Sequence, residues 1–155
     1  IVLPSGSCAG QVIVHYPELF AGDAAWEPRA KALSAKTHEL TVFLSDILKV
    51  SPRARFDGAV TYHDSCSGLR ELGIKAQPRK LLAAVAGLRL IEMRDANVCC
   101  GFGGTFCVKY PEISNHMTAD KCREIAESGA DTVILDGELA PSQLPHSQNG
   151  EAGVA

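Results

Sequence analysis

The sequence predicts an α/β fold with parallel strands. Short apolar runs at residues 59–62, 88–93 and 132–135 alternate with segments of helical periodicity, and strands that alternate with helices pair in parallel. A further helical pattern, at residues 26–50, precedes the first run. The chain of 155 residues is long enough to build a core of this kind. We therefore expect a Rossmann-like three-layer domain with a short parallel sheet, preceded by a long helix.

The N-terminal part is expected to hold a strand, a turn and that long helix. Residues 1–3 are apolar and end a buried strand, residues 4–8 form a turn of Pro, Ser, Gly and Cys, and residues 12–15 open the next element. Over residues 26–50 apolar side chains recur at spacings near three and four. A proline suits the first turn of this helix, and the Ser51-Pro52 pair ends it.

The rest of the chain carries the alternating strands and helices. Residues 53–58 are polar and are expected to connect the two parts. A loop at 63–68 follows the first strand, and a glycine-rich loop at 97–105 follows the second. Helices are expected at residues 78–85 and 111–128, with Gly129 as the C-cap of the second.

Composition excludes several classes of function. The net charge of -3 implies no basic surface for nucleic acid. The chain has no apolar run long enough to cross a membrane and opens with no signal peptide, so we expect a cytoplasmic protein. Six cysteines would allow disulfides in a secreted protein, but clustered cysteines in a reducing compartment more often bind metal or do redox chemistry.

The most informative motif is the adjacent pair Cys99 and Cys100, followed by Gly101, Gly103 and Gly104. Adjacent thiols are hard to explain as packing, whereas adjacent thiolates can hold one metal centre. Thiolates favour iron–sulfur clusters, zinc or Cu(I). The glycines let the backbone turn sharply and bring its N–H groups toward negatively charged sulfur.

A third cysteine is predicted at the same place in the fold. Cys66 follows the first strand of the alternating region, as Cys99 and Cys100 follow the second. Ligands bind at the carboxyl ends of the strands in an open parallel sheet. If the two strands are neighbours, the three thiols meet at one edge of the sheet.

Three segments around these cysteines resemble a known family. Residues 63–71 (HDSCSGLRE), 99–106 (CCGFGGTF) and 109–114 (KYPEIS) are similar to the cysteine-rich (CCG) domain family, and most of all to its lactate-utilisation type. This family contains the iron–sulfur subunits of lactate and glycolate oxidation and of heterodisulfide reductase. The resemblance covers roughly residues 1–135. It implies a [4Fe-4S] type of cluster with Cys66, Cys99 and Cys100 as ligands.

The resemblance also implies a domain organisation. Residues 1–22 resemble the end of a first cysteine-rich domain, in which Cys8 would be the last ligand once that domain is complete. Residues 23–57 form the helix and linker, and residues 58–140 form a second cysteine-rich domain. Its expected closing cysteine falls on Ala140, so we expect the cluster to be labile or absent in this chain. Residues 141–155 are polar and are expected to be a disordered tail.

These observations favour an electron-transfer component without catalytic residues of its own. It would serve, with partner subunits, in a complex that oxidises a 2-hydroxy acid, with L-lactate to pyruvate as the expected reaction. An iron–sulfur subunit of glycolate oxidase or of heterodisulfide reductase is the nearest competing hypothesis. Two hypotheses of a different class are a structural zinc or thiol module without redox turnover, and a metal-free fragment.

The cysteines and polar groups outside this set receive simpler roles. Cys107 is expected to pack behind the loop, and Cys122, in the middle of a helix, is expected to be structural or exposed. His63 and Asp64 stand at the end of the first strand and are expected to order the loop through a hydrogen bond. His63 could also replace a missing ligand.

Overall fold

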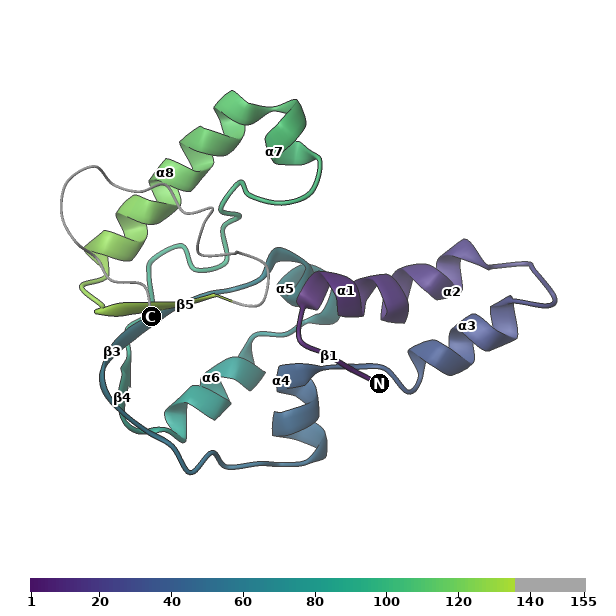
Figure 1. The fold of residues 1–155 in the computed structure, drawn as a ribbon, viewed down its shortest axis with the longest axis horizontal. Helices are drawn as coiled ribbons and strands as arrows, with labels where there is room; N and C mark the ends of the chain where they lie inside the picture. Colours follow the sequence, from purple (N-terminus) through teal and green to yellow (C-terminus); the bar gives the residue numbers. More distant parts are fainter. Residues whose placement is uncertain (136–155) are drawn as a thin grey trace.

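The protein is described by a computed structural model, in which residues 1–135 are placed (Figure 1). It has the predicted α/β fold with short parallel sheets. No helix within the described residues is long and apolar enough to span a membrane. The elements in chain order are β1 (Val2–Leu3), α1 (Gly6–Gly10), the π-helical turn η1 (Gln11–His15), α2 (Tyr16–Leu19), α3 (Glu27–Ser34), β2 (His38–Glu39), α4 (Leu40–Val42), the π-helical turn η2 (Phe43–Ile47), β3 (Arg55–His63), α5 (Cys66–Leu72), α6 (Ala76–Ala83), β4 (Ala86–Leu90), α7 (Phe106–Lys109), α8 (Pro111–Glu127) and β5 (Thr132–Leu135).

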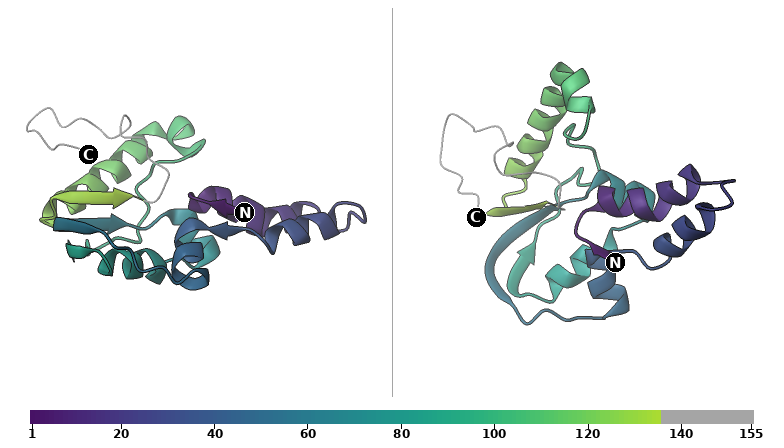
Figure 2. Two further views of the ribbon diagram at one scale, coloured as in Figure 1. Left: turned by 60° about the horizontal axis from the view of Figure 1, so that its bottom comes forward. Right: turned by 45° about the vertical axis from the view of Figure 1, so that its right-hand side comes forward.

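The main sheet has the order β4-β3-β5, and both pairings are parallel. Central strand β3 pairs through Val60 with Leu90 on one side and with Thr132 on the other. Residues 59–63 of this strand are all buried, as expected for a strand covered on both faces. Helix α8 lies on one face of the sheet and α6 on the other, which gives the three predicted layers (Figure 2).

Two predictions about this sheet were wrong in detail. The segment at 53–58, expected to be a connector, contains the start of β3, because the strand extends to Arg55 opposite Ala86. The second strand lies at Ala86–Leu90 rather than at 88–93. Its last ladder contact is the hydrogen bond from the Ile91 amide to the Val60 carbonyl, after which the chain leaves the sheet.

The turn predicted at residues 4–8 was also wrong, because a helix begins at Gly6. Helical structure then continues through η1 to the end of α2, so residues 12–15 lie inside it and open no new element. Gly6 allows this helix to pack closely on α5: a Cβ at this position would lie 2.7 Å from the Gly68 amide nitrogen. The N-terminal segment is thereby attached to the helix that carries Cys66.

The long helix predicted over residues 26–50 was wrong as one element. It is interrupted after α3 by strand β2, which pairs in parallel with β1, and helical structure resumes in α4. Glu39 explains the interruption, because its buried carboxylate accepts hydrogen bonds from the amides of Thr41 and Val42 and so caps a new helix. The apolar spacing is shared by two short helical segments.

Candidate functional site

Cys66 stands at the start of a helix and not in the loop predicted for residues 63–68. Strand β3 ends at His63, and α5 begins at Cys66 itself. Ser65 is the N-cap of α5, since its Oγ accepts a hydrogen bond from the Gly68 amide at 3.3 Å. Cys66 is therefore held in the first turn of α5, with only Asp64 and Ser65 between it and the strand.

Asp64 holds this strand end in place through Arg79 of α6. The guanidinium donates to both carboxylate oxygens of Asp64, at 2.7 and 2.9 Å, and to both of Glu92, at 2.6 and 3.0 Å. The Asp64 side chain is only 1% exposed, so the ion pair lies in the protein interior. Hydrogen bonds to Asp64 and Glu92 raise the pKa of Arg79 and keep it charged. Asp64 thus orders the loop, as predicted, but with a partner that no sequence motif indicates.

The glycine-rich loop predicted at residues 97–105 is confirmed as non-helical. Two hydrogen bonds attach this loop to α8. Thr118 Oγ1 donates to the Cys100 carbonyl at 2.9 Å, and Ser114 Oγ donates to the Gly101 carbonyl at 2.8 Å. Gly101 has φ +79°, a conformation that favours glycine, and its amide donates to Cys99 Sγ at 3.4 Å. An N–H directed at a cysteine sulfur is the arrangement expected from the sequence, here seen for Gly101.

The structure brings Cys66 and Cys99 together. Burial raises the pKa of the Cys66 thiol to about 11, and a hydrogen bond with the Cys99 side chain adds to the shift. Cys100 lies close enough to raise the same pKa further through its charge, while Arg70 acts in the opposite direction. These two cysteines come from α5 and from the loop after β4, and more than thirty residues of sequence separate them.

The predicted site residues are only partly assembled. Within residues 1–135, no group of three or more Cys, His, Asp or Glu side chains is arranged to hold a metal ion. Cys8 lies exposed on α1, and Ala140 lies outside the described residues. Gly103 and Gly104 have φ values of +136° and +51°, so both positions favour glycine. As a donor set, the thiols suit a soft metal or iron–sulfur group. The described residues bring Cys66 and Cys99 close enough to interact, with Cys100 nearby.

Comparison with known proteins places this site in a family. Residues 60–137 match the family model described as "Cysteine-rich domain", which includes Cys66, Cys99 and Cys100. The chain belongs to the cysteine-rich domain family. The matched region opens within β3 and contains both the contacting thiols and the helix α8 that supports the loop.

The chain is also similar to curated proteins named Lactate utilization protein A. It is 50% identical to the protein of Geobacillus kaustophilus over 135 residues, which is 86% of this chain and 56% of that protein. For the protein of Exiguobacterium sp. the identity is 48%, with 86% and 55% covered. For that of Oceanobacillus iheyensis it is 44%, again with 86% and 55% covered. The chain thus spans little more than half the length of these relatives.

Two further side chains of the cysteine-rich domain lie near the site. Cys122, on α8, lies one helical turn beyond Thr118, the residue that contacts Cys100. Burial and the charge of Cys100 raise the pKa of Cys122. The spacing of four residues from Thr118 is the signal that places it on this face. His63 is buried, its Nδ1 has no hydrogen-bond partner among residues 1–135, and burial and the charge of Lys121 lower its pKa.

Proposed function

We propose that this chain is part of an iron–sulfur electron-transfer subunit. Cys66, Cys99 and Cys100 would hold the iron–sulfur group, of the [4Fe-4S] type, with a further ligand from outside this set. The observation that supports this most strongly is that Cys66 and Cys99, thiols from two different elements of the domain, lie close enough for Cys99 to raise the pKa of Cys66. When bound, such a group supplies one-electron transfer.

The names of the relatives support a role in lactate use. We propose a component of a complex that oxidises L-lactate to pyruvate in the cytoplasm. Partner subunits would carry out the oxidation of the substrate, and this component would accept electrons without catalytic residues of its own. Because the relatives are longer, we also propose that residues 1–22 are the end of a first cysteine-rich domain and that Cys8 serves that domain.

The protein residues would tune the site electrostatically. The Gly101 N–H points at Cys99 Sγ, so it would stabilise negative charge on that sulfur. Thr118 and Ser114, both on α8, bind the carbonyls of Cys100 and Gly101. These bonds would keep the Gly101 N–H directed at Cys99 Sγ. Arg70, in α5, lowers the pKa of Cys66 and would favour its thiolate.

Anaerobic reconstitution with ferrous iron and sulfide tests this proposal. We expect a brown protein that contains both iron and acid-labile sulfide and that bleaches reversibly on reduction with dithionite. The Cys99→Ser variant should lose the iron, whereas Cys122→Ser, a matched change of a half-buried thiol, should keep it. A colourless protein that takes up one equivalent of zinc and no iron would contradict the proposal.

A second variant tests the expected closing ligand. Changing Ala140→Cys should raise the iron bound per protein and slow its loss in air, because a further thiolate would complete the set. Changing Ser142→Cys provides a matched control with a new thiol two residues away. Equal iron retention in both variants and in the unchanged protein would show that position 140 supplies no ligand.

A further inference from the structure

A cavity lies on the helical hairpin of α2 and α3, and none of the cysteines lines it. Its volume is about 540 Å³, within the range of roughly 300–1,000 Å³ that is typical of small-molecule sites. The hairpin projects from the sheet β4-β3-β5, so the cavity is separate from the loop after β4 (Figure 1). The cavity therefore needs an explanation other than the proposed electron transfer.

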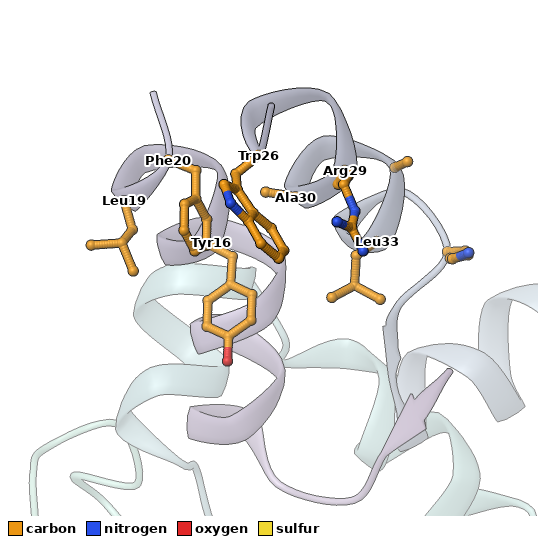
Figure 3. Close-up of a pocket in the computed structure, with 9 residues that line it drawn as sticks. Tyr16, Leu19, Phe20, Trp26, Arg29, Ala30 and Leu33 are labelled. Carbon is orange, nitrogen blue, oxygen red and sulfur yellow. The ribbon is translucent and has the colours of Figure 1, made fainter. Parts of the chain in front are cut away.

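One wall of the cavity is aromatic. Phe20 stacks on Trp26 with ring centroids 5.8 Å apart, and Tyr16 meets Phe20 edge to face at 6.2 Å. Leu33 faces these rings from α3 (Figure 3). Trp26 is 48% exposed despite this packing, so a large apolar surface remains open. Such a surface favours the apolar body of a ligand.

The rim of the cavity is cationic. Arg29 lies over the Trp26 ring at 4.3 Å from its centroid, and Lys36 lines the cavity as well. Among residues 1–135 neither side chain has a carboxylate partner, whereas Lys31 on the same helix pairs with Glu27 at 2.6 Å. None of the described residues that line the cavity is Asp or Glu. The positive charge at this cavity is therefore left for an anion to balance.

From these features we propose that the α2–α3 cavity binds an amphipathic organic anion. Its aliphatic or aromatic body lies between the ring wall and Leu33, and its carboxylate faces Arg29 and Lys36. The aromatic wall supplies the apolar contact, and the two cations, Arg29 and Lys36, favour a negatively charged ligand. The described lining of this site lies within residues 16–36 and includes none of the cysteines proposed to hold a metal group.

The chain carries its own reporter for this site, because Trp26 is its single tryptophan. We expect dodecanoate, below its micelle concentration, to change the fluorescence of Trp26 saturably, with a dissociation constant below about 100 µM. Dodecanol and dodecyltrimethylammonium provide neutral and cationic probes with the same chain. Both should bind at least about fivefold more weakly, and added salt should weaken only dodecanoate.

Three variants test whether Arg29 and Lys36 cause the preference for an anionic ligand. Arg29→Gln and Lys36→Gln should each weaken dodecanoate binding by about three- to fivefold and leave dodecanol binding unchanged. Lys31→Gln removes a cation of the same helix that does not line the cavity and should change neither. Circular dichroism checks that each variant is folded. The proposal is overturned if dodecanoate leaves Trp26 fluorescence unchanged, if dodecanol binds equally well, or if Lys31→Gln weakens binding as much as Arg29→Gln.

Discussion

Cys66 combines two features that rarely occur in one thiol. It starts a helix, a position that favours a thiolate, yet burial and its hydrogen bond with Cys99 raise its pKa to about 11. The protonated thiol is therefore the stable form in the metal-free protein. Binding of a soft metal would displace that proton, as it does wherever thiolates become ligands.

The alkylation rate of Cys66 tests whether its pKa is raised. In metal-free protein at pH 8, its thiolate fraction should be about 100-fold below that of a thiol with the ordinary pKa of 9.0. Alkylation by iodoacetamide, followed at each cysteine by peptide mass spectrometry, should be correspondingly slow at Cys66. Its rate should rise about tenfold per pH unit between pH 8 and 10, because the pKa lies above this range. A rate that levels off below pH 9 would contradict the raised pKa.

The ion pair between Asp64 and Arg79 gives a second prediction at this scale. Arg79→Gln should lower the free energy of unfolding by about 3 kcal/mol, because it leaves a buried carboxylate without its partner. Arg55→Gln breaks an exposed pair with Asp57 and should cost less than about 0.5 kcal/mol. Urea denaturation of the two variants measures both losses of unfolding free energy. Equal midpoints would show that the buried Asp64–Arg79 pair stabilises the fold no more than the exposed Arg55–Asp57 pair.

At the scale of elements, the geometry of the cysteine loop at residues 97–105 depends on helix α8. The loop has no regular structure of its own, so its shape depends on the contacts that Ser114 and Thr118 make with its carbonyls. Of the three glycines in this loop, Gly101 lies closest to α8. A Cβ at this position would lie 2.6 Å from Met117 Cβ and 2.8 Å from the Ser114 carbonyl oxygen.

Substitution of two glycines separates packing from backbone strain. Gly101→Ala should lower the free energy of unfolding by about 3 kcal/mol, since it adds a steric clash to the strain of a positive φ. Gly104→Ala introduces similar strain at φ +51° with no atom within 4 Å of the new Cβ, and should cost about 1 kcal/mol. Equal losses in thermal or urea unfolding would show that the loop does not pack on α8 as described.

The elements also show what the sequence could and could not predict. Alternating apolar runs predicted strands near 59–62 and 132–135 correctly, because the buried part of central strand β3 and the half-buried edge strand β5 are both rich in apolar residues. The spacing of apolar residues at 26–50 predicted one long helix wrongly. Two short helical segments that follow one another in the sequence can show the same apolar periodicity as a single helix. The break depends on the buried Glu39 carboxylate, whose role as a cap needs the three-dimensional contacts with Thr41 and Val42.

The whole molecule carries two proposed sites, the cysteine site and the α2–α3 cavity, in different parts of the fold. The parallel sheet brings the end of β3 and the loop after β4 together, and this juxtaposition of Cys66 with Cys99 was predictable from the order of strands and cysteines alone. The partner of Asp64, and the cationic aromatic cavity between α2 and α3, were not predictable, because each depends on side chains from segments that no motif connects.

The most direct measurement is the iron and acid-labile sulfide bound by the Cys66→Ser variant after anaerobic reconstitution. Cys66 is remote in sequence from the Cys99 and Cys100 pair, so it matters for iron binding only if the fold brings the thiols into one site. We expect Cys66→Ser to lose most of the iron and sulfide of the unchanged protein, while Cys107→Ser retains them. Iron and sulfide at the unchanged level in Cys66→Ser would contradict a shared site.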